Sequence, residues 1–148
     1  MPRVVAVCVS EEKGTVKKAV DEIYVRKNHG VEGDAHAGEV FRQVSILASE
    51  SVDKLRDKMP NIAAGAFAEN ILTSGICLYE LAIGTKLRVG KALLEVRQIG
   101  KDCHNEGCVI KRQTGDCVMP REGIFASVLE GGVIKPGDLI LFEFTQTQ

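Results

Sequence analysis

The stretch that decides the fold is Gly84-Thr85-Lys86-Leu87-Arg88-Val89-Gly90-Lys91-Ala92-Leu93-Leu94-Glu95-Val96. Two strand-like segments, residues 84–89 and 92–96, flank Gly90-Lys91, a two-residue turn of the kind that closes a β-hairpin. Because a hairpin joins neighbouring antiparallel strands, this stretch predicts an antiparallel sheet.

Further short strands are predicted on both sides of the hairpin. Residues 4–9 form a continuous apolar run, and β-branched or apolar residues also favour strands at 22–26, 43–47 and 67–72. The pattern of a turn directly before a strand occurs at residues 82–87 and again at 135–140. We interpret these two segments as corners of a barrel. Short strands with frequent turns and few helices predict a mainly β fold, a barrel or a sandwich.

Two short helices are predicted within this β-rich chain. Ser49 is a candidate N-cap, with Val52, Leu55 and Met59 at helical spacing before Pro60 ends the segment. The apolar stripe of this helix is interpreted as core packing. A second helix is predicted over residues 123–130, where the glycine pair at 131–132 would cap it.

Length and charge narrow the classes of function. The chain has 148 residues and a formal charge of −1 from 19 basic and 20 acidic side chains. We therefore expect a single domain over residues 1–148, with no bulk electrostatic attraction to nucleic acid or membrane. Neither a membrane span nor a signal peptide is predicted, which favours a cytoplasmic protein with reduced thiols. Five cysteines, an odd number, also argue against a disulfide framework.

Cys103 is the strongest candidate for a reactive group. It follows Gly100, which breaks the predicted strand at residues 93–99, so a loop should expose the thiol. Lys101 and His104 lie beside it, and nearby positive charge favours the thiolate, the form that acts as nucleophile and metal ligand. Cys8, in contrast, lies inside an apolar run and is predicted to be buried and inert.

Three kinds of chemistry remain open for the cysteine cluster. A structural zinc site has suitable ligand types in Cys103, His104, Cys108 and Cys117, but there is no CxxC pair. A Cys–His nucleophile would need two adjacent side chains to face one substrate, and no activating third member is evident. A thiolate that binds a soft metal or carries sulfur as a persulfide needs only one accessible cysteine and nearby cations.

Five motifs occur in an order that resembles the MOSC domain, named for the C-terminal part of molybdenum-cofactor sulfurases, in its short stand-alone type. They are Gly30-Val31-Glu32-Gly33-Asp34-Ala35-His36, Arg42-Gln43-Val44-Ser45-Ile46-Leu47, Phe67-Ala68-Glu69-Asn70-Ile71, Ile83-Gly84-Thr85-Lys86-Leu87 and Ile99-Gly100-Lys101-Asp102-Cys103. The resemblance implies a MOSC-type β-barrel, association with the molybdenum cofactor (molybdopterin) and sulfur handling through one cysteine. In family members that reduce N-hydroxylated compounds, the equivalent cysteine is a molybdenum ligand, a position that Cys103 occupies here.

The function predicted on this basis is a molybdopterin-binding protein, a sulfur carrier, or both. An alternative is a molybdenum-dependent reductase of N-hydroxylated compounds that uses external electron donors, because the chain has no ferredoxin-like cysteine pattern. Another is a zinc-stapled interaction module. No lysine has the context of a pyridoxal-phosphate Schiff base, so a cysteine desulfurase would be a separate partner, as would molybdenum-cofactor biosynthesis proteins.

Three basic residues are candidates for binding the anionic cofactor. Arg42 opens one of the motifs, and its guanidinium suits a terminal phosphate, although a packing or solvated arginine fits equally well. Arg121 precedes the predicted second helix and could bind an anion there, or lie on the surface. Lys101 adds positive charge next to Cys103.

Other motif residues have less specific predictions. Asn70 could hydrogen-bond a pterin or fix a loop, of which the second is favoured. Asp34 is expected to be structural in its glycine-rich loop, whereas His36 is retained as a cofactor-binding candidate. Cys108 and Cys117 could resolve a Cys103 persulfide into a disulfide, or could be packed.

Overall fold

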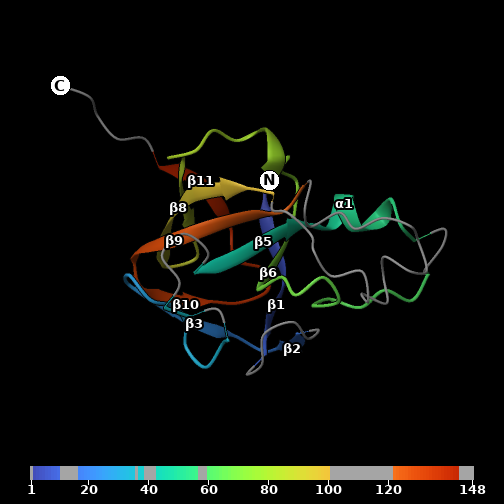
Figure 1. Ribbon diagram of the computed structural model, residues 1–148, viewed down its shortest axis with the longest axis horizontal. Coiled ribbons are helices and arrows are strands. Elements are labelled where there is room, and N and C mark those ends of the chain that lie inside the picture. The colour runs from blue at the N-terminus through green and yellow to red at the C-terminus, as the bar shows by residue number, and fades with distance from the viewer. Residues whose placement is uncertain are drawn as a thin grey trace.

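The computed structural model describes residues 2–10, 17–35, 37–38, 43–56, 60–100 and 122–143. These residues form mainly β-strands, the class predicted from the sequence, with one short α-helix at the side of the molecule (Figure 1). Among them, no helix combines the length and hydrophobicity needed to cross a membrane.

An eight-stranded sheet contains most of the strands. In spatial order its members are β11 (Ile140–Glu143), β7 (Lys86–Val89), β8 (Ala92–Ile99), β9 (Ile124–Glu130), β5 (Val44–Ala48), β6 (Ile71–Ser74), β1 (Arg3–Val9) and β2 (Lys18–Val20). All neighbours are antiparallel except β5 and β6, which run parallel. A second, three-stranded sheet consists of β10 (Gly132–Ile134), β3 (Ile23–Arg26) and β4 (Gly30–Val31).

The predicted hairpin is confirmed. Strands β7 and β8 pair antiparallel, with Leu87 opposite Leu94 and Val89 opposite Ala92. Gly90 occupies the first turn position with φ of 57°, a left-handed conformation that favours glycine. A side chain here would also be crowded, because an added Cβ would meet the carboxylate of Asp138.

The predicted barrel is corrected to an open, β-sheet-rich fold, because the ladder of strands does not close. Strand β2 is the last strand at one end of the sheet and pairs with the second half of β1, from Val7 to Val9. Only the start of β1 reaches the other end of the sheet, through an isolated bridge between Arg3 and Leu139. The Val4 N–H donates to the Asp138 carbonyl at 2.8 Å in the same region.

The repeated turn-then-strand pattern is confirmed, and its two strands lie side by side. Thr85 N–H donates to the Ala82 carbonyl at 3.1 Å, and Asp138 N–H donates to the Lys135 carbonyl at the same distance. The third residue of each turn is a glycine with φ of 92° or 93°, as a type II turn requires. The strands that follow, β7 and β11, pair antiparallel.

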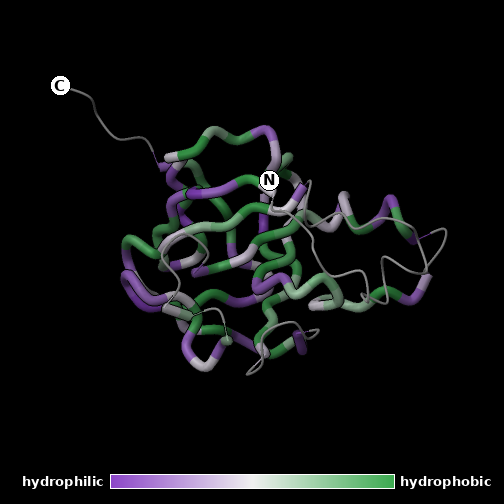
Figure 2. The backbone as a smooth tube through the Cα atoms, viewed as in Figure 1, coloured by the Kyte–Doolittle hydropathy of each residue, from purple (hydrophilic) through white to green (hydrophobic). Residues whose placement is uncertain are grey.

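Two hydrophobic clusters lie on opposite faces of β5, β6 and β9. The larger fills the space between the sheets, and the smaller lies under α1 (Ser49–Asp53) and residues 60–67. Figure 2 shows hydrophobic residues along the central strands and hydrophilic residues along outer turns. The smaller cluster contains Leu47, Val52, Leu55, Ile62, Phe67, Leu72 and Phe125.

The predicted second helix, residues 123–130, is wrong: this segment is strand β9. Ile124, Ala126 and Val128 enter the larger cluster, whereas Phe125 enters the smaller one. A strand buried on both faces is apolar at consecutive positions, so it loses the alternation that identifies a strand from sequence.

Two other predicted boundaries also change. Helix α1 covers only Ser49–Asp53 and its N-cap is Ala48, although Val52 and Leu55 are buried as expected. Strand β6 begins at Ile71, not at residue 67. The reason is that the Glu69 carboxylate accepts the N–H groups of Gly65 at 2.7 Å and Phe67 at 3.1 Å, which holds this segment in a turn.

Candidate functional site

Most of the predicted site residues lie outside the described part of the chain. Asn70 is the one predicted cofactor contact within it. The placement of the others therefore stays a prediction. They are His36, Arg42, Lys101, Cys103, His104, Cys108, Cys117 and Arg121.

Asn70 is fully buried at the junction of three strands. Its Oδ1 accepts the Ser45 backbone N–H at 3.0 Å, and its Nδ2 donates to the Cys8 carbonyl at 3.1 Å. The Ser45 hydroxyl lies 3.1 Å from the same Oδ1. These contacts support the loop-fixing interpretation of Asn70, because its side chain links β5 to β1 across the start of β6.

A buried ion pair fixes the glycine-rich loop. The Lys17 ammonium lies 2.7 Å from Asp34 Oδ1, and the two side chains are 1% and 0% exposed. The same oxygen accepts the Ser10 backbone N–H at 3.0 Å. This arrangement agrees with the structural role expected of Asp34.

Two further ionisable groups are buried near Lys17. Burial raises the pKa of Glu69, while the hydrogen bonds from backbone N–H groups and the charge of Lys17 lower it in part. Burial raises the pKa of the Cys8 thiol to about 12, with a further contribution from Glu69. A thiol with so high a pKa is neutral at physiological pH, which agrees with the prediction that Cys8 is inert.

The segment that carries Cys103 leaves and re-enters the described structure at one end of the main sheet. Gly100 N–H donates to the Gly123 carbonyl at 2.7 Å, directly beyond the pairing of Ile99 with Ile124. Strands β5 and β6 also finish at this end, because β5 pairs antiparallel with β9 and parallel with β6. Helix α1 follows β5 here, so we call this the α1 end of the sheet.

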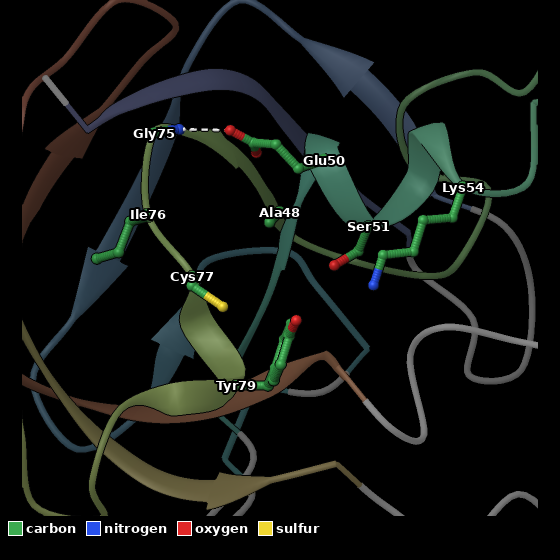
Figure 3. Close-up of a pocket in the computed structure, with 8 residues that line it drawn as sticks. All are labelled: Ala48, Glu50, Ser51, Lys54, Gly75, Ile76, Cys77 and Tyr79. Carbon is green, nitrogen blue, oxygen red and sulfur yellow. Dashed lines mark hydrogen bonds between the residues drawn. The ribbon is translucent and has the colours of Figure 1, made fainter.

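A pocket of about 280 Å³ opens at the α1 end (Figure 3). Helix α1 and the residue before it form one wall, and the segment that follows β6 forms the other. Glu50 connects the walls, since its Oε2 accepts the Gly75 N–H at 2.7 Å. The lining residues are Ala48, Glu50, Ser51, Lys54, Gly75, Ile76, Cys77 and Tyr79.

Glu122 attaches the end of the Cys103-bearing segment to the pocket wall. Its Oε1 accepts the Ser51 hydroxyl at 2.6 Å, and the Lys54 ammonium donates to both of its carboxylate oxygens at 2.8 and 2.9 Å. The pocket and the point where residues 101–121 rejoin the sheet are therefore direct neighbours.

Cys77 and Tyr79 lie on the wall formed by the segment after β6, and Lys54 lies on the α1 wall. The Lys54 ammonium lies 5.5 Å from the centre of the Tyr79 ring. A hydrogen bond with Cys77 and the charge of its thiolate raise the pKa of the Tyr79 phenol, and Glu122 acts in the same direction, while Lys54 lowers it. The phenol is thus protonated at neutral pH and can donate to the sulfur.

The sequence did not indicate this pocket. No basic residue lies next to Cys77 in the chain, since Lys54 comes from the turn after α1. The one available signal was a cysteine two residues before a tyrosine in the segment 75–80. Among the described residues, no group of three histidine, cysteine or acidic side chains is arranged to hold a metal ion.

Comparison with known proteins identifies both a family and a fold. The model of the MOSC domain matches residues 33–141. The YuaD protein from Bacillus subtilis has a similar structure, with 22% identity, a TM-score of 0.76 and coverage of 95% of this chain and 94% of that one. A comparison with curated proteins finds no match.

Two structures of YiiM share the fold as well. YiiM from Geobacillus stearothermophilus is 22% identical, with a TM-score of 0.73 and coverage of 97% of this chain and 76% of that one. YiiM from Escherichia coli is 20% identical, with a TM-score of 0.67 and coverage of 99% and 72%, respectively.

Proposed function

Because the chain belongs to the MOSC domain family, we propose that it binds a molybdopterin-type cofactor or carries sulfur to one, with the Cys103 thiolate as the reactive group. The observation that supports this proposal most is the family match over residues 33–141, which includes the motif that ends at Cys103.

The donor set suits such a cofactor chemically. A cysteine thiolate is a soft ligand that molybdenum accepts, and the guanidinium groups of Arg42 and Arg121 and the ammonium of Lys101 suit a terminal phosphate. When bound, the cofactor would supply a metal centre able to exchange sulfur or electrons. Asn70 contributes indirectly, since its contacts hold β1, β5 and β6 together.

The position of the pocket also supports the proposal. Gly100 and Glu122 border the segment that carries Cys103, and Glu122 is bonded to Ser51 and Lys54 on the pocket wall. Helix α1 and the two residues that border the Cys103-bearing segment therefore meet at the α1 end of the sheet. If the protein carries sulfur, a cysteine desulfurase is the class of partner that would deliver it to Cys103 as a persulfide.

Metal analysis of protein purified from its native host tests this function. We expect stoichiometric molybdenum in the wild type and its loss in Cys103→Ser, with Cys108→Ser as the matched control that retains it. Stoichiometric zinc without molybdenum would instead favour the zinc-stapled module. Molybdenum together with reduction of an N-hydroxylated substrate by external electron donors would identify the reductase.

Sulfur transfer is tested separately by peptide mass spectrometry after incubation with a desulfurase and cysteine. A reducible persulfide should form on Cys103 and be absent in Cys103→Ser. Cys8 is the internal reference, since burial raises its pKa to about 12 and should keep it unmodified. An adduct on Cys108 or Cys117 while Cys103 stays unmodified would contradict the assignment.

A further inference from the structure

Lys17 joins two segments that carry MOSC motifs. It lies directly before β2, and only 3% of the residue is exposed. Its ammonium lies 2.7 Å from Asp34 Oδ1 in the glycine-rich loop, and its backbone N–H donates to the Gly65 carbonyl at 2.9 Å. One buried residue therefore contacts both the first motif, residues 30–36, and the turn at residues 65–68, where the third motif begins.

The position of the glycine-rich loop depends on Asp34. Its Oδ1, which binds the ammonium, also accepts the Ser10 backbone N–H at 3.0 Å, directly after β1. Ala35 N–H donates to the Ser10 carbonyl at 2.7 Å, and Ala37 N–H donates to the Asp34 carbonyl at 3.1 Å. These bonds hold the backbone on either side of His36, the residue of this loop that is a candidate for cofactor binding.

The turn at residues 65–68 depends on contacts from outside itself. Ala68 has φ of 64°, a left-handed conformation that a residue other than glycine keeps only where its surroundings hold it. Glu69 supplies part of this support, since its Oε2 accepts the Gly65 N–H at 2.7 Å. Lys17 supplies another part, because its backbone lies so close to Gly65 that an added Cβ there would collide with the Lys17 carbonyl. A shift of Lys17 should therefore move the turn.

Charge links the same two segments through the Lys17 ammonium. The ammonium is bonded to Asp34, and its positive charge lowers the pKa of Glu69, against the larger effect of burial. All three side chains are almost inaccessible to solvent, so water screens these interactions little. A change of charge at either carboxylate should therefore alter the interaction of Lys17 with the other.

We propose that Lys17 is a positioning residue that makes the glycine-rich loop and the turn at residues 65–68 order as one unit. A ligand that orders the loop then also orders the turn, and through it Asn70 at the junction of β1, β5 and β6. The identity of this ligand, a molybdopterin-type cofactor, rests on the proposed function. The link between the loop and the turn rests on the contacts of Lys17.

Backbone hydrogen exchange, followed by NMR, tests the link with one substitution in each segment. Asp34→Asn removes the charge in the glycine-rich loop, and Ala68 N–H, which donates to the Gly65 carbonyl at 2.9 Å, reports on the turn. We expect the exchange rate of Ala68 to rise at least about fivefold, the lower end of typical coupling between sites. Glu69→Gln is the reciprocal change, and it should raise the exchange rate of Ala35.

Two controls separate this coupling from a general loss of stability. Val96 N–H donates to the Thr85 carbonyl in the main sheet at 2.8 Å and reports on unfolding of the core, so each rate is taken relative to that of Val96. Glu32→Gln removes an exposed carboxylate in the same glycine-rich loop. It should leave the relative rate of Ala68 unchanged.

A variant without the ion pair should lose the coupling. Lys17→Met/Asp34→Asn removes both charges of the pair, which a fold tolerates better than the loss of one. In this background Glu69→Gln should no longer change the relative exchange rate of Ala35. A role of Lys17 in stability alone would not produce this difference between the two backgrounds.

Three results would overturn the proposal. One is an Ala68 rate in Asp34→Asn that rises no more than that of Val96. Another is a response of Ala35 to Glu69→Gln that persists in the double variant. The third is added molybdopterin that slows exchange at Ala35 but not at Ala68. If molybdopterin slows neither, the proposed function fails, and the results of the substitutions still decide the role of Lys17.

Discussion

Ser45 and Asn70, which lie 25 residues apart, are joined through both backbone and side chain. The Asn70 N–H donates to the Ser45 carbonyl at 2.9 Å, and the Ser45 N–H donates to Asn70 Oδ1 at 3.0 Å. Both residues belong to motifs that resemble the MOSC family. The contact shows that these motifs converge in a buried polar junction, in addition to any role toward a ligand.

Removal of the Asn70 side chain should destabilise this junction. Asn70→Ala leaves the Ser45 N–H and the Cys8 carbonyl without their buried partner, so we expect the free energy of unfolding to fall by about 2–4 kcal/mol. Urea denaturation measures this change. Asn61→Ala, at an exposed position, is the control and should change it by less than about 0.5 kcal/mol. Equal effects of the two substitutions would contradict a structural role for Asn70.

The buried Lys17–Asp34 pair should be more important for stability than an exposed pair of similar geometry. Lys17→Met removes the cationic partner of a buried carboxylate, and we expect a loss of about 3–5 kcal/mol. Arg26 and Glu32 form an exposed pair at 3.0 Å, so Arg26→Met should cost less than about 1 kcal/mol. Thermal or urea unfolding of the two variants compares them directly. A small loss in Lys17→Met would mean that water reaches this pair.

Local chemistry explains which parts of the fold the sequence could predict. The Gly90-Lys91 hairpin and the turns at Gly84 and Gly137 depend on residues adjacent in the chain, and all three are confirmed. Strand β9 was missed because the alternation of its side chains is hidden when both faces are buried. The predicted barrel was wrong because the sheet stays open, and no local sequence pattern predicts that β2 pairs with the second half of β1.

The candidate site also has one part that the local sequence predicts and another part that depends on contacts between distant segments. Cys103 has its charged neighbours in the adjacent sequence, so its reactivity could be proposed from sequence alone. Cys77 has its partners in a different segment, since Lys54 follows α1 and Glu122 precedes β9. Only the packing of these segments at the α1 end of the sheet brings the groups together, and sequence periodicity carries no information on such contacts.

Burial of Glu69 should make stability depend on pH in a defined direction. Because burial raises its pKa above the ordinary value of 4.5, the folded protein binds this proton more tightly than the unfolded chain. The resulting stabilisation is present below pH 4.5 and is lost as the pH rises through the folded-state pKa. Glu69→Gln removes this loss, so the free energy of unfolding of the variant relative to wild type should increase with pH.

Urea unfolding between acidic and neutral pH measures this trend. Glu32→Gln is the matched control, since it removes an exposed carboxylate. The change in the pH profile should be larger for Glu69→Gln than for this exposed control. A constant difference between Glu69→Gln and wild type at every pH would show that the carboxyl has the same proton affinity in both states.

The titration of Tyr79 should report on the geometry of the pocket. Cys77 raises the pKa of this phenol and Lys54 lowers it, so Cys77→Ala should shift the titration to lower pH and Lys54→Met to higher pH. The chain has two tyrosines, and the Tyr24→Phe background leaves one phenol to follow by ultraviolet absorbance. Lys91→Met controls for the loss of a lysine charge outside the pocket and should leave the midpoint unchanged. Opposite shifts in Cys77→Ala and Lys54→Met require the thiol and the ammonium to act on the same hydroxyl; shifts in the same direction, or none, would place one of them away from the pocket in solution.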